Sequence, residues 1–386
     1  MGNINSASRR KALALKHSKR KTTTTNIVVT DSIFPPEIII EILSWVEIEC
    51  HGTLMLVCKH WNALIQDRHF MEKHMSRAQR TVRKFVYYYK PDVKTNRAEE
   101  IVLRRYYRYV YACDGLYLLK NVITKKYCIR NPFTKQALEL PDPHEGIRGI
   151  VFSYVPSTSN YKFVSVYDDE RGTECCEVLS VGSDELSSWR VLKMPKRDYL
   201  KKQRKKFSVV STGDAVHCVR VIARGAVMVE EVISLDLGTE KFTVTNIPSG
   251  LYESWEKVWP LNFMGKLVLV DRMGADLCVL ELEDYKKQKW GKRKTLIPSA
   301  SMKALEDEHG TVFPYSFDFQ LAEVFWFWVK DTMFISYDLR TREENELERL
   351  EKEGCETMHP LQHSLVHLEG MQPEENQRRH PHSPWH

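Results

Sequence analysis

The feature that most constrains the fold is a pattern that recurs five times along the chain. In each copy an apolar run ends in a polar turn, and a short second run leads to a proline or to acidic residues. The copies read YCIRNPFTKQALELP, EVLSVGSDELSSWRVLKMP, EVISLDLGTEKFTVTNIP, CVLELEDYKKQKWGKRKTLIP and MFISYDLRTREENELE. Their turns fall near residues 134, 186, 239, 286 and 341, so the period is about fifty residues. Apolar alternation bounded by Gly, Asp and Asn is typical of half-buried strands, and the pattern therefore predicts a repeated antiparallel unit.

The repeat also indicates how the units are arranged. Each unit has room for four strands, and a radial array of such units leaves only short sheet edges. We expect residues 112–350 to form a mainly antiparallel, propeller-like all-β domain of five or six irregular blades. Five blades come from the repeats, and the sixth would combine the connector with the segment after Glu356. The run FWFWV, from Phe325 to Val329, is expected to be a strand buried on both faces.

The N-terminal part is different in kind, because it reads as helical. Pro36 suits the first position of a helix, and Glu37 suits the first turn. A buried stripe follows at helical spacing, namely Ile39, Ile42, Leu43 and Val46. A second helix is expected to carry Leu54, Val57, Cys58, Trp61 and Ile65. Surplus apolar residues such as Phe34, Ile38 and Leu64 have no partner within so small a unit, and such a surplus predicts a protein-binding surface.

These two helical segments resemble an F-box, the module that docks a Skp-type adaptor of a cullin-based ubiquitin ligase. Phe34 stands at the family's opening leucine, and VCKHWNALI matches its Val-Cys-Lys-x-Trp-x-x-Leu. The sequence differs from the family pattern in the middle of the module, where His51 and Gly52 are expected to weaken a short helix. The resemblance places an F-box at residues 31–75 and implies an adaptor-binding set of Phe34, Pro35, Pro36, Glu37, Ile39, Ile42, Leu43, Val57, Cys58, Trp61 and Leu64.

The β part resembles the F-box-associated domain that follows the F-box in a large group of plant proteins. The resemblance rests on CDGLYLL, IRNPFTKQALELP, SSWRVLKMP, VISLDLGTEKFTVTNIP and ISYDLRTRE, which occur in the family's order. It implies a kelch-like domain that recruits a target protein. In YESWEKVWP, Trp255 and Trp259 are candidates for contact with that target, and packing in the core is the alternative.

Composition and motifs argue against other classes. The net charge of +6 comes from local runs, at residues 9–21 and 196–206, so no nucleic-acid partner is expected. The nine cysteines contain no CxxC pair, and the C-terminal histidines, which include His380, His382 and His386, fall in a Pro- and Gln-rich stretch. We therefore expect no metal and no cofactor. No GxSxG, GxxxxGK[ST] or HExxH motif is present, so no catalytic residue is expected.

The remaining segments are expected to be a disordered basic tail (1–30), a connector (76–111) and a flexible C-terminal tail (351–386). Gly2 with Ser6 fits a myristoylation pattern, and the basic cluster behind it fits a nuclear localisation signal equally well. We expect a nuclear or cytoplasmic protein, with peripheral membrane attachment only if Gly2 is myristoylated.

The sequence therefore predicts an α+β multidomain protein that is not an enzyme. Its F-box would bind a Skp-type adaptor and, through it, a cullin, while its β domain would recruit a protein target of unknown identity for ubiquitination. The alternative is a kelch-like scaffold whose degenerate F-box no longer binds adaptor, and His51 and Gly52 are the residues that favour it.

Overall fold

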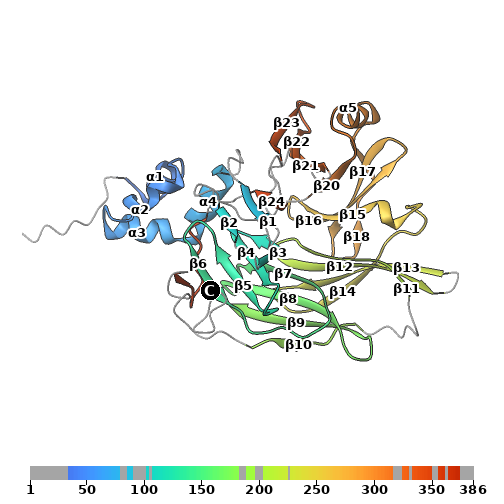
Figure 1. The fold of residues 1–386 in the computed structure, drawn as a ribbon, viewed down its shortest axis with the longest axis horizontal. Coiled ribbons are helices and arrows are strands. Elements are labelled where there is room, and N and C mark those ends of the chain that lie inside the picture. Colours follow the sequence, from blue (N-terminus) through green and yellow to red (C-terminus); the bar gives the residue numbers. More distant parts are fainter. Residues whose placement is uncertain are drawn as a thin grey trace, which may run out of the picture.

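A computed structural model describes residues 34–78, 85–89, 101–103, 107–181, 188–195, 203–224, 227–315, 324–329, 333–349, 355–360 and 364–373. These residues form a small helical unit and a larger β unit (Figure 1). The helical unit contains α1 (Pro36–Leu43), the 3-10 turn η1 (Ile48–Cys50), α2 (His51–Leu54), α3 (Lys59–Gln66) and α4 (Arg68–Ala78). Within the described ranges, no helix has the length and apolar character needed to cross a membrane.

The β unit is a five-bladed antiparallel propeller, in which each blade is one sheet of consecutive strands. Blade 1 is β3 (Tyr107–Cys113), β4 (Leu116–Asn121), β5 (Tyr127–Asn131) and β6 (Gln136–Glu139), extended by β25 (Gln372–Pro373). Blade 2 is β7 (Ile147–Val155), β8 (Asn160–Asp168), β9 (Glu174–Val181) and β10 (Arg190–Leu192). Blade 3 is β11 (Gln203–Ser211), β12 (Ala215–Arg224), β13 (Val227–Asp236) and β14 (Phe242–Asn246).

The last two blades carry the helices of the β unit. Blade 4 is β15 (Val258–Phe263), β16 (Lys266–Met273), β17 (Asp276–Asp284) and β18 (Lys289–Trp290), with β19 (Lys294–Ile297) also paired to β17. Blade 5 is β20 (Val312–Tyr315), β21 (Val324–Val329), β22 (Met333–Asp338) and β23 (Glu344–Arg349). The 3-10 turn η2 (Trp255–Lys257) precedes blade 4, and α5 (Ser299–His309) links blades 4 and 5.

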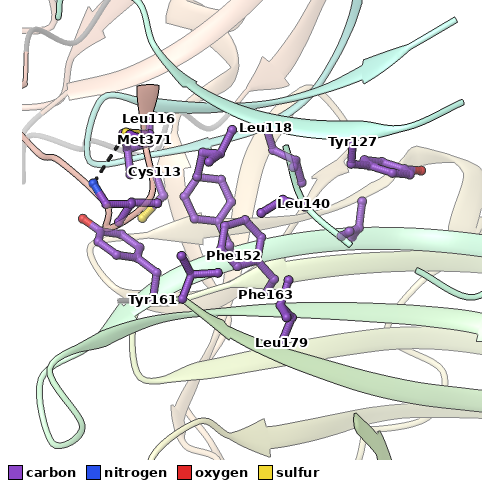
Figure 2. Close-up of a cluster of buried hydrophobic side chains, with 14 of the residues drawn as sticks. Cys113, Leu116, Leu118, Tyr127, Leu140, Phe152, Tyr161, Phe163, Leu179 and Met371 are labelled. Carbon is purple, nitrogen blue, oxygen red and sulfur yellow. Dashed lines mark hydrogen bonds between the residues drawn. The ribbon is translucent and has the colours of Figure 1, made fainter. Parts of the chain in front are cut away.

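The apolar cores lie between blades, because each sheet buries side chains on both faces. Blades 1 and 2 share Leu116 and Leu118 of β4 with Phe152 and Phe163 of β7 and β8, all completely buried (Figure 2). The rings of Phe152 and Phe163 stack with centroids 4.8 Å apart. The predicted inner strand FWFWV is confirmed as β21, since Phe325, Trp326 and Phe327 are 4 % exposed or less.

The same turn closes four blades and explains the sequence repeat. An Asn or Asp at the end of the third strand accepts hydrogen bonds from backbone N–H groups two or three residues later, which is the Asx-turn geometry. These residues are Asn131, Asp236, Asp284 and Asp338. Four residues further on, the chain takes a positive φ of 55–62° at Lys135, Glu240, Gln288 and Arg342. The fifth turn, near residue 186, lies outside the described residues.

Parts of the predicted connector and C-terminal tail belong to the fold. From the connector, β3 enters blade 1, while β1 (Phe85–Tyr89) and β2 (Ile101–Leu103) join β24 (Cys355–Pro360) in a three-stranded sheet. This smaller sheet is the combination of connector and C-terminal segment that the sequence suggested for a sixth unit. The flexible tail predicted at 351–386 is wrong for residues 364–373, because Val366, Leu368 and Met371 are buried in the core between blades 1 and 2.

Candidate protein-docking site

The first helix begins where the sequence predicts. Pro36 occupies the first turn of α1, and the carbonyl of Pro35 accepts hydrogen bonds from Ile38 N at 3.0 Å and Ile39 N at 3.2 Å. The missing N–H of Pro36 therefore costs no hydrogen bond. The helix ends at Leu43, and the backbone then turns through Ser44 and Trp45.

One side of α1 packs into the core of the helical unit. Ile39, Ile40 and Leu43 are buried at 8 % exposure or less and contact Ile65 of α3 and Phe70 of α4. Ile39 and Leu43, which were predicted to contact an adaptor, lie buried in this core and hold the helices together. The half-buried Trp61 and Leu64 pack against the same core.

The other side of the unit exposes large apolar side chains, which we call the docking face. Its members and exposed fractions are Phe34 53 %, Ile38 45 %, Ile42 54 %, Trp45 64 %, Leu56 85 % and Val57 59 %. Ile38, Ile42 and Trp45 follow i, i+4, i+7, so they form one stripe along α1 and the turn after it. Pro35, Pro36, Glu37 and Cys58 of the predicted adaptor-binding set are exposed as well.

The docking face is completed by a turn rather than by a second long helix. The predicted helix over 54–65 is divided, because α2 ends at Leu54 and α3 begins at Lys59. Cys58 is the N-cap of α3 and its Sγ accepts the backbone N–H of Trp61 at 3.4 Å. The intervening turn brings Leu56 and Val57 to the surface.

The departures in the middle of the unit have a structural role. His51 is completely buried and its ring lies 5.4 Å from that of Phe70 and 4.6 Å from that of His74. His51 Nδ1 lies 3.1 Å from the carbonyl of Glu47, and His74 Nε2 lies 3.1 Å from the carbonyl of Val46. His51 thus fills part of the core, and the short helix that it was expected to weaken forms as α2.

A charged group on α1 orients Trp45. Glu41 contacts Lys73 at 2.6 Å, accepts the indole N–H of Trp45 at 3.2 Å and pairs with Arg77. Arg77 also lies 4.3 Å from the centroid of the Trp45 ring, a cation–π distance. The hydrogen bonds from Lys73, Trp45 and Arg77 lower the pKa of Glu41 from 4.5 to about 2.

The helical unit is tied to blades 1 and 2 through Arg68. Its guanidinium donates to Tyr161 Oη at 2.7 Å and to Asp114 Oδ2 at 2.6 Å, and Tyr161 Oη donates to the same carboxylate at 2.7 Å. Arg68 also covers the ring of Tyr154 at 3.9 Å. Asp114 and Gly115 form the β3–β4 turn with φ of 52° and 74°, so the DG pair of CDGLYLL shapes the hairpin and also binds α4. From the other side, Leu365 packs on the core of the helical unit.

The two tryptophans predicted to contact a target are not surface aromatics. Trp255 is 7 % exposed, and its Nε1 donates to Glu230 Oε1 at 2.8 Å. Trp259 is half-buried against the core between blades 4 and 5. Trp255 therefore packs in the core between blades 3 and 4, which was the alternative to target contact. Gly2 lies outside the described residues.

One group of side chains has the composition of a metal site. Ligand atoms of Glu308, His309 and Glu344 lie within 4.8 Å of one another, and His309 Nε2 is 3.2 Å from Glu344 Oε1. This hydrogen bond between α5 and β23 accounts for the arrangement without an ion.

Comparison with protein families agrees with this division into two units. Residues 32–73 match the F-box domain, and residues 69–367 match the F-box associated beta propeller domain. The second match covers most of the chain, and the chain belongs to the F-box associated beta propeller family. F-box domains generally bind Skp-type adaptors. Comparison with curated proteins finds no match in sequence.

Two solved structures show a distant likeness to this chain. An oligogalacturonate lyase from Vibrio parahaemolyticus has a TM-score of 0.36 and 9 % identity, over 64 % of this chain and 78 % of that one. Pyrococcus horikoshii acylaminoacyl peptidase has a TM-score of 0.35 and 10 % identity over 62 % of this chain, which spans 38 % of the peptidase. Both TM-scores are below 0.5, so neither structure bears on the function of this chain.

Proposed function

We propose that this chain is a non-catalytic substrate receptor of a Skp–cullin–F-box ubiquitin ligase. In this role the F-box binds a Skp-type adaptor, the adaptor connects the chain to a cullin, and the propeller holds a target protein. Catalysis by the ligase then depends on proximity, because a held target presents its lysines at high effective concentration to the ubiquitin-carrying enzyme.

The observation that carries the proposal is the docking face. Six large apolar side chains lie exposed within residues 34–57, although the same helices bury Ile39, Ile40 and Leu43 at 8 % exposure or less. Large exposed apolar side chains gathered in one short segment are costly for a free protein and are typical of a docking site. Truncation of a central apolar contact in such an interface costs about 2 kcal/mol or more.

The junction between the two units also supports a receptor. A target is brought to a fixed place only if the propeller does not swing freely on the F-box. Arg68, Asp114 and Tyr161 form a closed set of hydrogen bonds across the junction. Leu365 adds an apolar contact from the C-terminal segment.

The test is binding of the full chain to purified Skp-type adaptors, measured by surface plasmon resonance. We expect the unaltered chain to bind at least one adaptor. Ile42→Asp places a charge in the middle of the docking face and should weaken binding roughly 100-fold or more, since an unpaired charge would be buried in an apolar contact.

The matched control is Ile123→Asp, which changes an isoleucine that is 65 % exposed on blade 1. This variant should bind like the unaltered chain. If no adaptor binds the folded full chain, or if both variants weaken binding equally, the receptor assignment is wrong and the scaffold alternative remains.

A further inference from the structure

A polar cluster lies between blades 3 and 4, where the strand β13 meets the loop before β15. It consists of Glu230, Tyr252, Asp271 and Arg293, with Trp255 beside them. Arg293 Nη2 pairs with Asp271 Oδ2, and Arg293 Nη1 donates to the carbonyl of Leu251 at 3.3 Å. The Tyr252 and Trp255 rings meet edge to face with centroids 4.8 Å apart. Residues from four separate segments, namely β13, the loop before β15, β16 and the loop before β19, thus meet at one place.

Several polar atoms of the cluster, on side chains that are buried or half-buried, lack a hydrogen-bond partner in the part of the chain that the structure describes. Glu230 Oε2, Tyr252 Oη, Asp271 Oδ1 and Arg293 Nε are buried and have no hydrogen-bond partner among the described residues. Asp271 itself is 5 % exposed. A buried polar atom without a partner is unfavourable, because its desolvation is not compensated, so four of them in one place point to a group that binds there.

The cluster carries an excess of negative charge. Asp271 is paired with Arg293, whereas the only side-chain partner of Glu230 in the described structure is the neutral indole N–H of Trp255. Two carboxylates therefore face one guanidinium. Burial raises the pKa of Asp271 above its ordinary value despite the adjacent Arg293, and it also raises that of Tyr252.

We propose that this cluster binds an arginine side chain of a protein target. A guanidinium offers several N–H donors in one plane, which suits acceptors at Glu230 Oε2, Asp271 Oδ1 and Tyr252 Oη. Its positive charge balances the unpaired carboxylate, and the Tyr252 ring offers a cation–π contact. Arg293 Nε is a donor and suits a backbone carbonyl of the same target. Trp255 is a positioning residue that holds Glu230.

The place of the cluster suits this role, which rests on the proposed receptor function. The F-box contacts the β3–β4 turn and the adjoining ends of β7 and β8, where the first strand of a blade ends. The cluster lies toward the opposite end of the sheets, where the first strands begin: Tyr252 and Trp255 precede β15, and Arg293 precedes β19. A target bound there would leave the docking face free for the adaptor.

The test is a titration of the full chain, without adaptor, with N-acetyl-arginine methylamide, followed through the indole N–H signal of Trp255 by NMR. The signal is assigned with Trp255→Phe. We expect a saturable shift in the millimolar range. The neutral isostere N-acetyl-citrulline methylamide should produce none, because it lacks the charge. Glu230→Gln keeps an acceptor for Trp255 but removes the unpaired charge, and it should weaken binding roughly tenfold or more.

The control is Glu256→Gln, which neutralises an exposed carboxylate in η2 and should leave the affinity unchanged. The assignment is overturned by absence of a saturable shift, by equal shifts from arginine and citrulline, or by full binding in Glu230→Gln. Because adaptor is absent from this titration, a negative result leaves adaptor binding intact, and failure of the receptor function would appear only in the adaptor experiment.

Discussion

The F-box and the propeller expose large apolar side chains in very different ways. The exposed set of the F-box falls within residues 34–57, whereas that of the propeller is scattered over Val122, Ile123, Val191, Met228, Met264 and Met273. These six residues come from four blades and from both ends of the sheets. Single exposed apolar residues are ordinary on a protein surface. The comparison teaches that the clustering of exposed apolar residues, more than their number, marks a docking face.

The largest expected effect is the difference in stability loss between truncating a buried apolar side chain of the propeller and truncating an exposed one of the docking face. Phe163 of the propeller is completely buried, and Phe163→Ala should lower the free energy of unfolding by about 3–5 kcal/mol. Ile42→Ala on the docking face should change it by less than about 0.5 kcal/mol. Urea denaturation of both variants provides the measurement. Equal losses would show that Ile42 belongs to the core and would remove the contrast between the two regions.

The pH dependence of stability should also distinguish the propeller from the F-box. Burial of His217 between Thr212 and Ser234 lowers its pKa to about 3, from 6.5. Below pH 6.5, His217 therefore binds a proton in the unfolded chain but stays neutral in the folded chain until the pH approaches 3. The stability that His217 contributes is full above pH 6.5 and falls by about 1.4 kcal/mol per pH unit as the pH drops toward 3.

Between pH 7.5 and 5.0 the unaltered chain should therefore lose about 2 kcal/mol more than His217→Gln. Glu41 on the F-box does not interfere with this measurement. Its contribution is present above pH 4.5 and is lost only as the pH falls toward about 2. Identical pH profiles for the two proteins would mean that His217 is not held neutral.

The junction between the regions can be loosened at Arg68. Arg68→Gln removes the guanidinium that donates to both Asp114 and Tyr161. The side chains of the Arg68–Asp114 ion pair are 25 % and 19 % exposed, respectively. We expect a loss of about 1–2 kcal/mol and faster hydrogen exchange in α4. The control is Arg148→Gln. The side chains of the Arg148–Asp168 ion pair are more exposed, at 39 % and 21 %, so its loss should lower stability less. If α4 exchanges no faster in Arg68→Gln, other contacts hold the F-box in place.

The smallest effect is expected at Gly52. Its backbone has ordinary negative φ, and a Cβ added there meets no atom within 4 Å. Gly52→Ala should stabilise the F-box by about 0.5–1 kcal/mol, because the unfolded chain loses freedom and α2 gains a better helix former. Thermal unfolding of the full chain measures this change, and a lower midpoint would contradict it.

Sequence reasoning predicted the elements whose signals are local. The Asx turns at Asn131, Asp284 and Asp338 and the proline start of α1 all depend on residues within four positions of one another. The division of the chain into a helical unit and a propeller-like β unit followed from these signals, and the F-box was identified by its resemblance to a known family.

The sequence could not decide which side of α1 faces outward. Ile38, Ile39, Ile40, Ile42 and Leu43 make the helix apolar nearly all round, so two stripes fit the same spacing. Only packing against Ile65 and Phe70 selects the buried one. Trp45 was overlooked for that reason, although it continues the stripe of Ile38 and Ile42. Leu56 was overlooked because one continuous helix was expected where the turn between α2 and α3 lies.

Contacts between residues far apart in the chain could not be predicted from the sequence either. Asn131 Nδ2 donates to the carbonyls of Ser364 and Val366, more than 230 residues away, at 2.9 Å each. Glu230, Asp271 and Arg293 likewise come from separate blades or loops. No local pattern records such pairs, because they depend on how the blades close around one another.

The most direct test of the central claim is hydrogen exchange of the full chain with and without a saturating Skp-type adaptor. We expect slower exchange of residues 36–45 and 55–58, which carry the docking face, and no change in the five blades. Unchanged exchange in these two segments, or protection confined to the propeller, would contradict it.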